Sequence, residues 1–166
     1  MKNRALRPRL FIGSSNESLD YAYAIQQNLE DDTEVTVWKN GIFQLTKTAV
    51  ESLIKALDKS DFAVFVFAPN DVLRLRKKNF AAVRDNVIFE LGLFVGKIGR
   101  TRTFVVAPKG VKQLRIPTDL AGLTLGQFDA RRKDKNLELR LGLSAARSGV
   151  KFEFVESELV QNFDKR

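Results

Sequence analysis

The sequence predicts an α/β fold in which a central sheet carries helices on both faces. Short apolar runs that are typical of buried strands alternate with segments whose apolar residues recur at helical spacing. The connections between these segments are short, and two of the runs end directly at a proline. Such alternation favours strand–helix–strand units, in which parallel strands are joined by right-handed crossovers.

The first part of the chain predicts two strands with one helix between them. Arg9–Ser14 is an apolar run that ends in a Gly-Ser-Ser turn, as expected for a buried strand. Ser18–Leu29 has apolar residues at the spacing of a surface helix. Val35–Trp38 alternates valine with threonine and predicts the second strand, and the glycine-containing segment Lys39–Leu45 predicts a loop.

A second helix is expected after this loop. Thr48 and Glu51 have the spacing of a capping box, in which each side chain bonds the backbone N–H of the other residue. The helix is expected to run to about Lys59. Four of its apolar residues are expected to face inward, namely Val50, Leu53, Ile54 and Leu57.

The second part of the chain predicts the centre of the sheet. Phe62–Ala68 is a continuous apolar run of the kind found in a strand that is buried on both faces. The polar and basic segment Asn70–Val83 predicts a loop with at most a helical turn. The later elements are expected to be a helix at Asn86–Lys97, a strand at Thr103–Ala107, a weaker strand at Leu123–Phe128 and a helix at Leu137–Ala146.

The chain has 166 residues, which fits one domain of ordinary size. We expect a basic N-terminal segment at residues 1–8, the domain itself at residues 9–150, and a C-terminal tail or final short element at residues 151–166. No segment after residue 130 is recognisable as a sensor domain. The chain is therefore compatible with a free-standing enzyme, an isolated domain or an effector that has a separate partner.

The composition excludes several kinds of catalysis. The chain contains no cysteine and no histidine, which removes thiol nucleophiles, serine–histidine triads, histidine bases and nearly all zinc sites. No metal site and no cofactor are expected. No apolar run reaches the ~18–20 residues that span a bilayer. We therefore expect a soluble, cytoplasmic protein that does not contact a membrane.

The formal net charge is +8 and the pI is about 9.9. The basic residues are scattered along the chain, no basic stretch is interleaved with aromatic residues, and no helix-turn-helix or zinc-finger pattern occurs. Nucleic-acid binding is therefore not expected. The phosphates of a nucleotide would benefit from the same positive charge.

Glu90 is a carboxylate inside an otherwise apolar helical segment. Val87, Leu91, Phe94 and Ile98 form the apolar stripe of that helix, and Glu90 lies beside it. Burial of an unpaired carboxylate costs several kcal/mol or raises its pKa. The residue is either a functional acid or an acid at the edge of the stripe that reaches water or pairs with Lys97.

Ligands of open parallel sheets bind outside the carboxyl ends of the strands. This rule predicts that four separate segments meet at one edge of the sheet. They are residues 13–16, residues 38–43, residues 69–71 and the start of the helix that carries Asn86 and Glu90.

Four segments share their pattern with a known family, namely Phe11–Ser15, Val37–Trp38, Phe62–Asp71 and Arg84–Phe94. Together they resemble the bacterial TIR-like domains that were once described as predicted nucleotide-binding proteins. The resemblance covers roughly residues 9–130. The stretch Arg-Asp-Asn-Val-Ile-Phe-Glu-Leu-Gly-Leu, which starts at Arg84, is its specific part.

The resemblance implies a flavodoxin-like sheet of five parallel strands and a NAD glycohydrolase that cleaves the nicotinamide–ribose bond. It also implies an assembly-activated effector of bacterial antiphage defence, a homo-oligomer formed through TIR–TIR contacts, and a cyclic-nucleotide sensor domain or partner protein. Glu90 matches the catalytic glutamate of the family. Ser14 and Ser15 match the loop near the nucleotide, and Trp38–Phe43 matches a mobile loop that helps subunits assemble.

The other candidate site residues each have two interpretations. Ser14 and Ser15 either bond a phosphate or ribose or only turn the chain. Trp38 either stacks on a base or packs in the core. Phe43 either lines the pocket or packs against a neighbouring subunit.

The residues at the start of the glutamate helix are similarly open. Arg84 pairs with Glu90, pairs with a phosphate, or is simply solvated. Asp85 and Asn86 either contact the substrate or only cap the helix.

One carboxylate is enough for the implied chemistry. Most glycosidases need a second carboxyl group to protonate the leaving oxygen. The nicotinamide of NAD is already cationic and leaves as a neutral molecule, so no general acid is required. Glu90 could stabilise the oxocarbenium-like ribose, hold its hydroxyls or form a transient ester.

Two further function classes fit the same residues. The first is a non-catalytic TIR module that signals by self-assembly, with Glu90 as a structural acid and Lys39–Leu45 as the contact surface. The second is a nucleoside-processing enzyme that transfers a glycosyl group. A dinucleotide with a pyrophosphate fits the basic charge better than a neutral nucleoside does.

Overall fold

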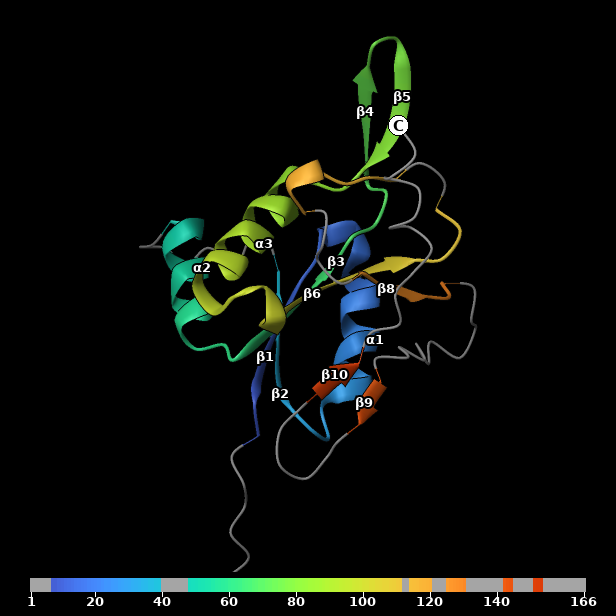
Figure 1. The fold of residues 1–166 in the computed structure, drawn as a ribbon. Coiled ribbons are helices and arrows are strands. Elements are labelled where there is room, and N and C mark those ends of the chain that lie inside the picture. Colours follow the sequence, from blue (N-terminus) through green and yellow to red (C-terminus); the bar gives the residue numbers. More distant parts are fainter. Residues whose placement is uncertain are drawn as a thin grey trace, which may run out of the picture.

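Five parallel strands form the central sheet, in the order β2-β1-β3-β6-β8 (Figure 1). Their bounds are β1 Arg9–Gly13, β2 Glu34–Trp38, β3 Phe62–Val66, β6 Thr103–Pro108 and β8 Leu125–Phe128. The structure is a computed structural model and describes residues 7–39, 48–111, 114–120, 125–130, 142–144 and 151–153. It confirms the expected flavodoxin-like α/β architecture.

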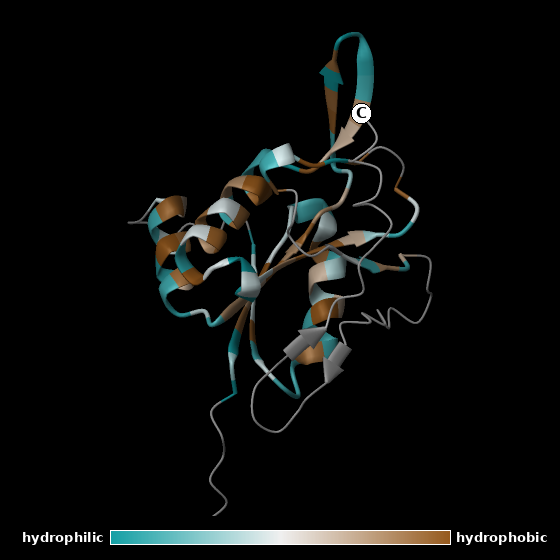
Figure 2. Cartoon of the chain, in the orientation of Figure 1, coloured by the Kyte–Doolittle hydropathy of each residue, from teal (hydrophilic) through white to brown (hydrophobic). Residues whose placement is uncertain are grey.

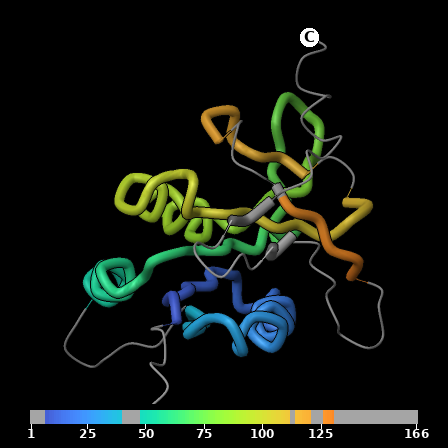
Figure 3. Tube along the Cα trace, turned by 60° about the horizontal axis from the view of Figure 1, so that its bottom comes forward, coloured from blue at the N-terminus to red at the C-terminus, as the bar shows by residue number. Residues whose placement is uncertain are grey.

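Three α-helices cover the two faces of the sheet (Figure 3). They are α1 Leu19–Leu29, α2 Ala49–Asp58 and α3 Asp85–Ile98. Three short 3-10 helices, Asn16–Ser18, Arg100–Arg102 and Thr118–Leu120, complete the helical elements of the described residues. The helix α1 packs on one face, and α2 and α3 pack on the other.

The alternation of side chains along each strand builds two core layers. Leu10 and Ile12 of β1 pack in the layer of α1, while Phe11 between them packs in the layer of α2 and α3. In β3, Val64 belongs to the first layer and Phe65 to the second. Both faces of these strands are buried, which explains why their sequences are continuously apolar (Figure 2).

The helix α2 begins as its sequence predicts. The Thr48 side chain accepts a hydrogen bond from the backbone of Glu51, and the Glu51 carboxylate accepts one from the Thr48 N–H. Leu53 and Leu57 are buried, but Val50 and Ile54 are 45% and 46% exposed. The prediction that all four apolar residues face inward was therefore wrong, because the helix packs on the sheet through Leu53, Ala56 and Leu57.

Residues 70–83 form a β-hairpin, and the prediction of a loop there was wrong. The strands β4 Asp71–Leu75 and β5 Lys78–Ala82 pair antiparallel, and β7 Leu114–Arg115 pairs parallel with β5. The two turn residues, Arg76 and Lys77, have φ values of 46° and 66°. Left-handed backbone at such residues costs ~1 kcal/mol each, and hairpin turns of this kind favour Asn-Gly. The turn therefore lacks the residues by which a hairpin is recognised in a sequence.

A helix was predicted at residues 137–146, and this prediction is wrong for residues 142–144, which the structure describes. Gly142–Ser144 forms β9, which pairs antiparallel with β10 Lys151–Glu153. Pairing with the nearby strand β10 overrides the local preference for helix. The other residues of the expected helix lie outside the described ranges. Across those ranges, no helix is long and apolar enough to cross a membrane.

Candidate functional site

The site lies at the carboxyl edge of the sheet, where β1 and β2 end beside the helix α3. Trp38 is the last residue of β2 and is in register with Gly13, the last residue of β1. Glu90 lies in the second turn of α3, on the side that faces the sheet. The structure therefore brings together Trp38 and Glu90, which are far apart in the sequence.

Gly13 leaves room for an aromatic ring at the end of β1. A Cβ atom at Gly13 would lie 2.4 Å from the ring of Phe65 on β3, which is far inside contact distance. The rings of Phe11, Phe65 and Phe94 pack below this point, with centroids 4.4 Å apart for Phe11 and Phe94. This aromatic packing places α3 against the sheet and so positions Glu90.

Glu90 is buried, with 4% of its surface exposed. Its Oε1 accepts a hydrogen bond of 3.1 Å from the indole Nε1 of Trp38. Its Oε2 is buried and has no hydrogen-bond partner among the described residues. Burial raises the pKa of Glu90 from its ordinary value of 4.5 to about 7, against the opposing effect of the Trp38 hydrogen bond. The side chain is thus buried, and none of the described residues pairs it with a cation.

The two pairings considered for Glu90 from the sequence do not form. Lys97 instead forms a salt bridge of 2.9 Å with Asp58 of α2. Arg84 forms salt bridges with Glu17 and with Asp71, the latter at 3.3 Å. Arg84 is therefore a partly exposed residue paired with two other carboxylates and not with Glu90, and a phosphate contact stays a prediction.

Trp38 has a defined environment. Its ring packs on Phe11 with centroids 5.9 Å apart, and its N–H points to Glu90. Trp38 therefore packs in the core, as one of its two interpretations had it, and its indole also orients the Glu90 carboxylate. Stacking on a base stays a prediction.

Ser14 and Ser15 follow β1 and are both buried. The Ser14 hydroxyl has no hydrogen-bond partner within the described part of the chain. The Ser15 hydroxyl donates to Oδ1 of Asn70 at 2.9 Å, and the Ser18 hydroxyl donates to the same atom at 3.0 Å. Ser14 is therefore the one of the two serines whose hydroxyl is available to a ligand.

Asp85 and Asn86 open the helix α3. The Asp85 carboxylate accepts a hydrogen bond of 2.9 Å from the backbone N–H of Asn86, and both side chains are exposed. This contact supports the capping interpretation for Asp85. Substrate contacts of Asp85 and Asn86 stay predictions, and Phe43 lies outside the described residues.

Three residues of this edge were not singled out from the sequence. Glu17 pairs with Arg84, while Ser18 and Asn70 take part in the serine network. Asn70 lies in the turn after β3, so the rule for parallel sheets was the signal that could have found it. Glu17 and Ser18 gave no such signal, because their partners are more than 50 residues away.

A groove of about 840 Å³ runs beside β2 and α2. Trp38 lines it together with the basic residues Arg9, Lys55 and Lys59. Glu90 is not among its lining residues, so Trp38 is the link between the groove and the buried carboxylate. Across the described ranges, no group of three or more carboxylates could hold a metal ion.

The chain is similar to a known family over most of its length. Residues 9–130 match the family described as CAP12/Pycsar effector protein, TIR domain. The Pycsar effector protein PaPycTIR of Pseudomonas aeruginosa is 47% identical over 116 residues, which are 69% of this chain and 37% of that protein. The CD-NTase-associated protein 12 of Flavobacterium daejeonense is 40% identical over 124 residues, 75% of this chain and 39% of that protein. The chain thus spans about two fifths of the length of these relatives.

A search of solved structures gave a weaker likeness. The metal-soaked Flv1 flavodiiron core from Synechocystis sp. PCC6803 has a TM-score of 0.41 and 19% identity, over 64% of this chain and 24% of that chain. This likeness carries no argument about function.

Proposed function

The chain belongs to the family of CAP12/Pycsar effector TIR domains, and from this premise we propose that it cleaves the nicotinamide–ribose bond of NAD. Glu90 is the essential carboxylate of the proposed reaction. The observation that carries the proposal is the state of this side chain. One oxygen is held by the Trp38 indole and the other has no partner in the described residues, and residues 87–96 around Glu90 are otherwise apolar.

The raised pKa of Glu90 suits a cationic substrate. With a pKa of about 7, the free site holds the carboxyl group partly protonated at neutral pH. The positive nicotinamide ring of NAD would favour the ionised form, since an opposite charge within ~4–6 Å lowers the pKa of an acid. Substrate binding would therefore create the carboxylate at the place where it is needed.

The proposed reaction consumes water and needs no acid catalyst. The bond between ribose C1′ and the ring nitrogen breaks, and its electron pair stays on nicotinamide, which leaves as a neutral molecule. Positive charge moves to C1′ and its ring oxygen, where the Glu90 carboxylate stabilises it. Water then bonds to C1′ and loses a proton, which gives ADP-ribose.

Other residues of the carboxyl edge would hold the substrate. Ser14 offers a buried hydroxyl without a partner in the described part of the chain, which is suited to a ribose hydroxyl or a phosphate. Trp38 would orient Glu90 through its N–H and present its ring to the groove beside β2.

We further propose that the chain is the effector module of a bacterial antiphage system. One set of relatives is named as Pycsar effectors and another as CD-NTase-associated proteins. Both names fit a domain that is controlled by a cyclic nucleotide, sensed by a further domain or a partner. Subunit assembly would then switch the NAD-cleaving site on.

The test is release of nicotinamide from NAD by concentrated protein. We expect the Glu90→Gln variant to lose at least about a hundredfold in rate, as removal of one stabilising group in a buried site does. The matched control is Asp20→Asn, which removes an exposed carboxylate of α1 and should leave the rate unchanged. Equal rates for the wild type and Glu90→Gln would overturn the catalytic role of Glu90.

A protein that stays silent in this test is examined again under crowding conditions that force assembly. If it then assembles but leaves NAD intact, the proposed reaction is wrong. That outcome would support the non-catalytic signalling module, with Glu90 as a structural acid.

A further inference from the structure

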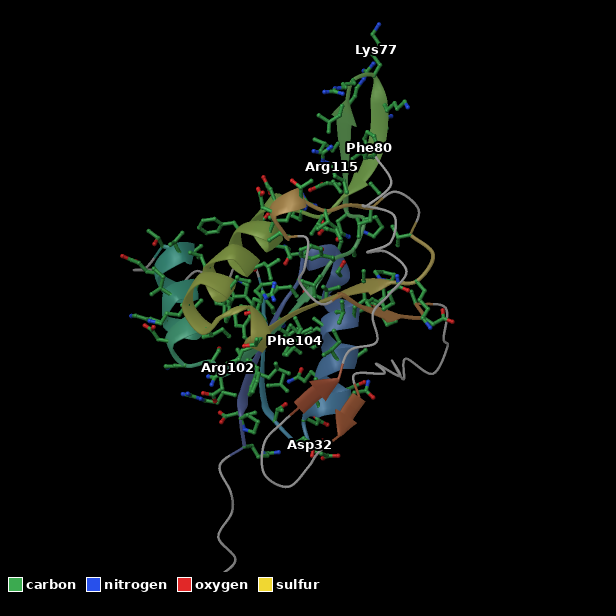
Figure 4. All side chains as sticks on the ribbon, viewed as in Figure 1. Asp32, Lys77, Phe80, Arg102, Phe104 and Arg115 are labelled. Atoms are coloured by element: carbon green, nitrogen blue, oxygen red, sulfur yellow. The ribbon has the colours of Figure 1, made fainter. Side chains whose placement is uncertain are left out.

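The hairpin of β4 and β5 has no part in the proposed chemistry. It projects from the carboxyl edge of the sheet, with Lys77 at its tip (Figure 4). Arg74, Arg76, Lys77 and Lys78 are all exposed, and none of them forms a salt bridge with the described residues. These four residues, here called the basic tip, place four positive charges on one narrow element.

The turn of the basic tip is unusual for its position. Arg76 and Lys77 both have left-handed backbone, where asparagine and glycine are favoured. The sequence thus holds two cations at the outermost point of the molecule, where a residue pair without charge would fit the backbone better. This choice indicates that the charges have a use at the surface.

The opposite end of the molecule is acidic. Glu30, Asp31, Asp32 and Glu34 lie between the end of α1 and the start of β2, and all four are exposed. Asp32 and Lys77 are labelled at the two ends of the view in Figure 4. These four residues are here called the acidic turn. They lie at the amino edge of the sheet, whereas the hairpin leaves its carboxyl edge.

Nearby cations leave the acidic turn negative. Arg7 donates to the backbone carbonyls of Glu30 and Asp31 and not to their carboxylates. Arg9 lies near Glu34, but its guanidinium group forms a bidentate pair with Asp61 at 2.9 Å and 3.0 Å. The four carboxylates of the turn therefore exceed the free positive charge beside them in the described residues.

We propose that the basic tip of one copy docks on the acidic turn of a second copy. The two surfaces have opposite charge and lie at opposite ends of one chain, so each copy can use both at once. Such head-to-tail contacts build an open row of subunits, whereas a two-fold dimer through either surface would oppose like charges. Contacts between exposed charges are individually weak, so the row forms only at high local concentration and low ionic strength.

The hairpin also connects this contact to the site. Asn70 immediately precedes the hairpin, and its side-chain oxygen accepts hydrogen bonds from the hydroxyls of Ser15 and Ser18. Arg84 follows it, pairs with Asp71 of β4, and occupies the N-cap position of the helix that carries Glu90. Docking at the tip would therefore restrain an element whose two ends both contact the edge of the candidate site. The inference deepens the assembly in the proposed function, but its readout is mass in solution and not NAD cleavage.

The test is sedimentation of the full chain over a range of concentration and salt. We expect association at low salt. It should be lost between about 0.05 M and 0.5 M salt, because the distance over which charges attract each other becomes shorter as the salt concentration rises. The variant Arg76→Asn/Lys77→Gly should raise the dissociation constant about two- to thirtyfold, since it removes two exposed pairs. It supplies the preferred turn residues, so an unfolded hairpin cannot explain the loss. The control Arg100→Asn/Lys109→Asn removes the same charge elsewhere and should associate as the wild type does.

Charge reversal gives the decisive comparison. One variant replaces all four cations of the basic tip by glutamate, and the other replaces all four carboxylates of the acidic turn by lysine, so that each change reverses the charge of its surface. Each variant should fail to associate alone. An equimolar mixture of the two should associate in alternation, because each variant then presents a surface opposite in charge to one on the other. A single chain that carries both sets of changes should also associate.

Three results would overturn the inference. The first is a mass that stays near 18.8 kDa at every concentration of the wild type at low salt. The second is a mixture of the reversed variants that does not associate. The third is association that is abolished by nuclease treatment and by the tip variants but not by the lysine changes in the acidic turn, which would assign the tip to nucleic acid.

Discussion

Glu90 is held in a position that makes ionisation costly. The side chain is almost fully buried, and the Trp38 N–H is the hydrogen-bond donor that the described residues supply to it. A single neutral donor replaces only part of the hydration that a carboxylate has in water. The result is a pKa of about 7, and a strongly shifted acid at the edge of a sheet is a mark of functional sites.

This shift predicts a pH dependence of stability. The pKa of Glu90 is raised in the folded state, so the folded protein binds a proton that the unfolded chain has lost. The resulting stabilisation is fully present below about pH 4.5 and is lost as the pH rises to about 7. At most ~3 kcal/mol is involved, from a shift of about 2.5 pH units.

Glu90→Gln provides the reference for this measurement, because the amide does not titrate. The unfolding free energy of the wild type relative to Glu90→Gln should fall between about pH 4.5 and 7 and level off above. Denaturant unfolding followed by circular dichroism measures both proteins. A difference that is constant with pH would contradict the raised pKa.

At the scale of elements, the missing side chain of Gly13 leaves room for the Phe65 ring over the end of β1. We expect Gly13→Ala to destabilise the protein by ~1–3 kcal/mol, because the new Cβ would collide with the Phe65 ring in a packed core. Gly92→Ala is the matched control. No atom lies within 4 Å of a Cβ at Gly92, so the change should stabilise α3 by up to ~1 kcal/mol. Thermal unfolding of both variants tests the contrast, and equal effects would refute it.

The elements also show how far a sequence alone can reach. The strands β1, β3 and β6 and the helix α3 were predictable, because their burial patterns are strong and local. The contact between Trp38 and Glu90 was not, since it depends on the pairing of β2 with β1. The rule for parallel sheets predicted the correct edge of the sheet. It could not show which of the two serines, Ser14 or Ser15, has a hydroxyl without a hydrogen-bond partner in the described residues.

The hairpin was missed for a different reason. Its turn contains Arg76 and Lys77 where the usual signal is Asn-Gly. None of the residues of its strands is buried, so they lack the apolar alternation that burial imposes on a strand. An element without buried residues leaves little trace in the core pattern from which strands are predicted.

At the scale of the whole molecule, assembly should control activity. If the site is completed only when subunits associate, the rate of nicotinamide release should rise faster than linearly with protein concentration. Dilution should then reduce the rate per subunit. Initial rates measured over a hundredfold range of protein concentration would detect this, since that range corresponds to about 2–3 kcal/mol in the free energy of association. Strict proportionality over that range would argue that a single copy is active.

The hydrogen bond between Trp38 and Glu90 has an optical consequence. Trp38 is the only tryptophan in the sequence, so indole fluorescence of the protein comes from this one position. A proton that leaves Glu90 places a negative charge next to the fluorophore, and emission should therefore change with a midpoint near pH 7. The same signal should respond to any ligand that touches the carboxylate. The protein thus carries its own reporter of the charge state of its candidate site, without a label.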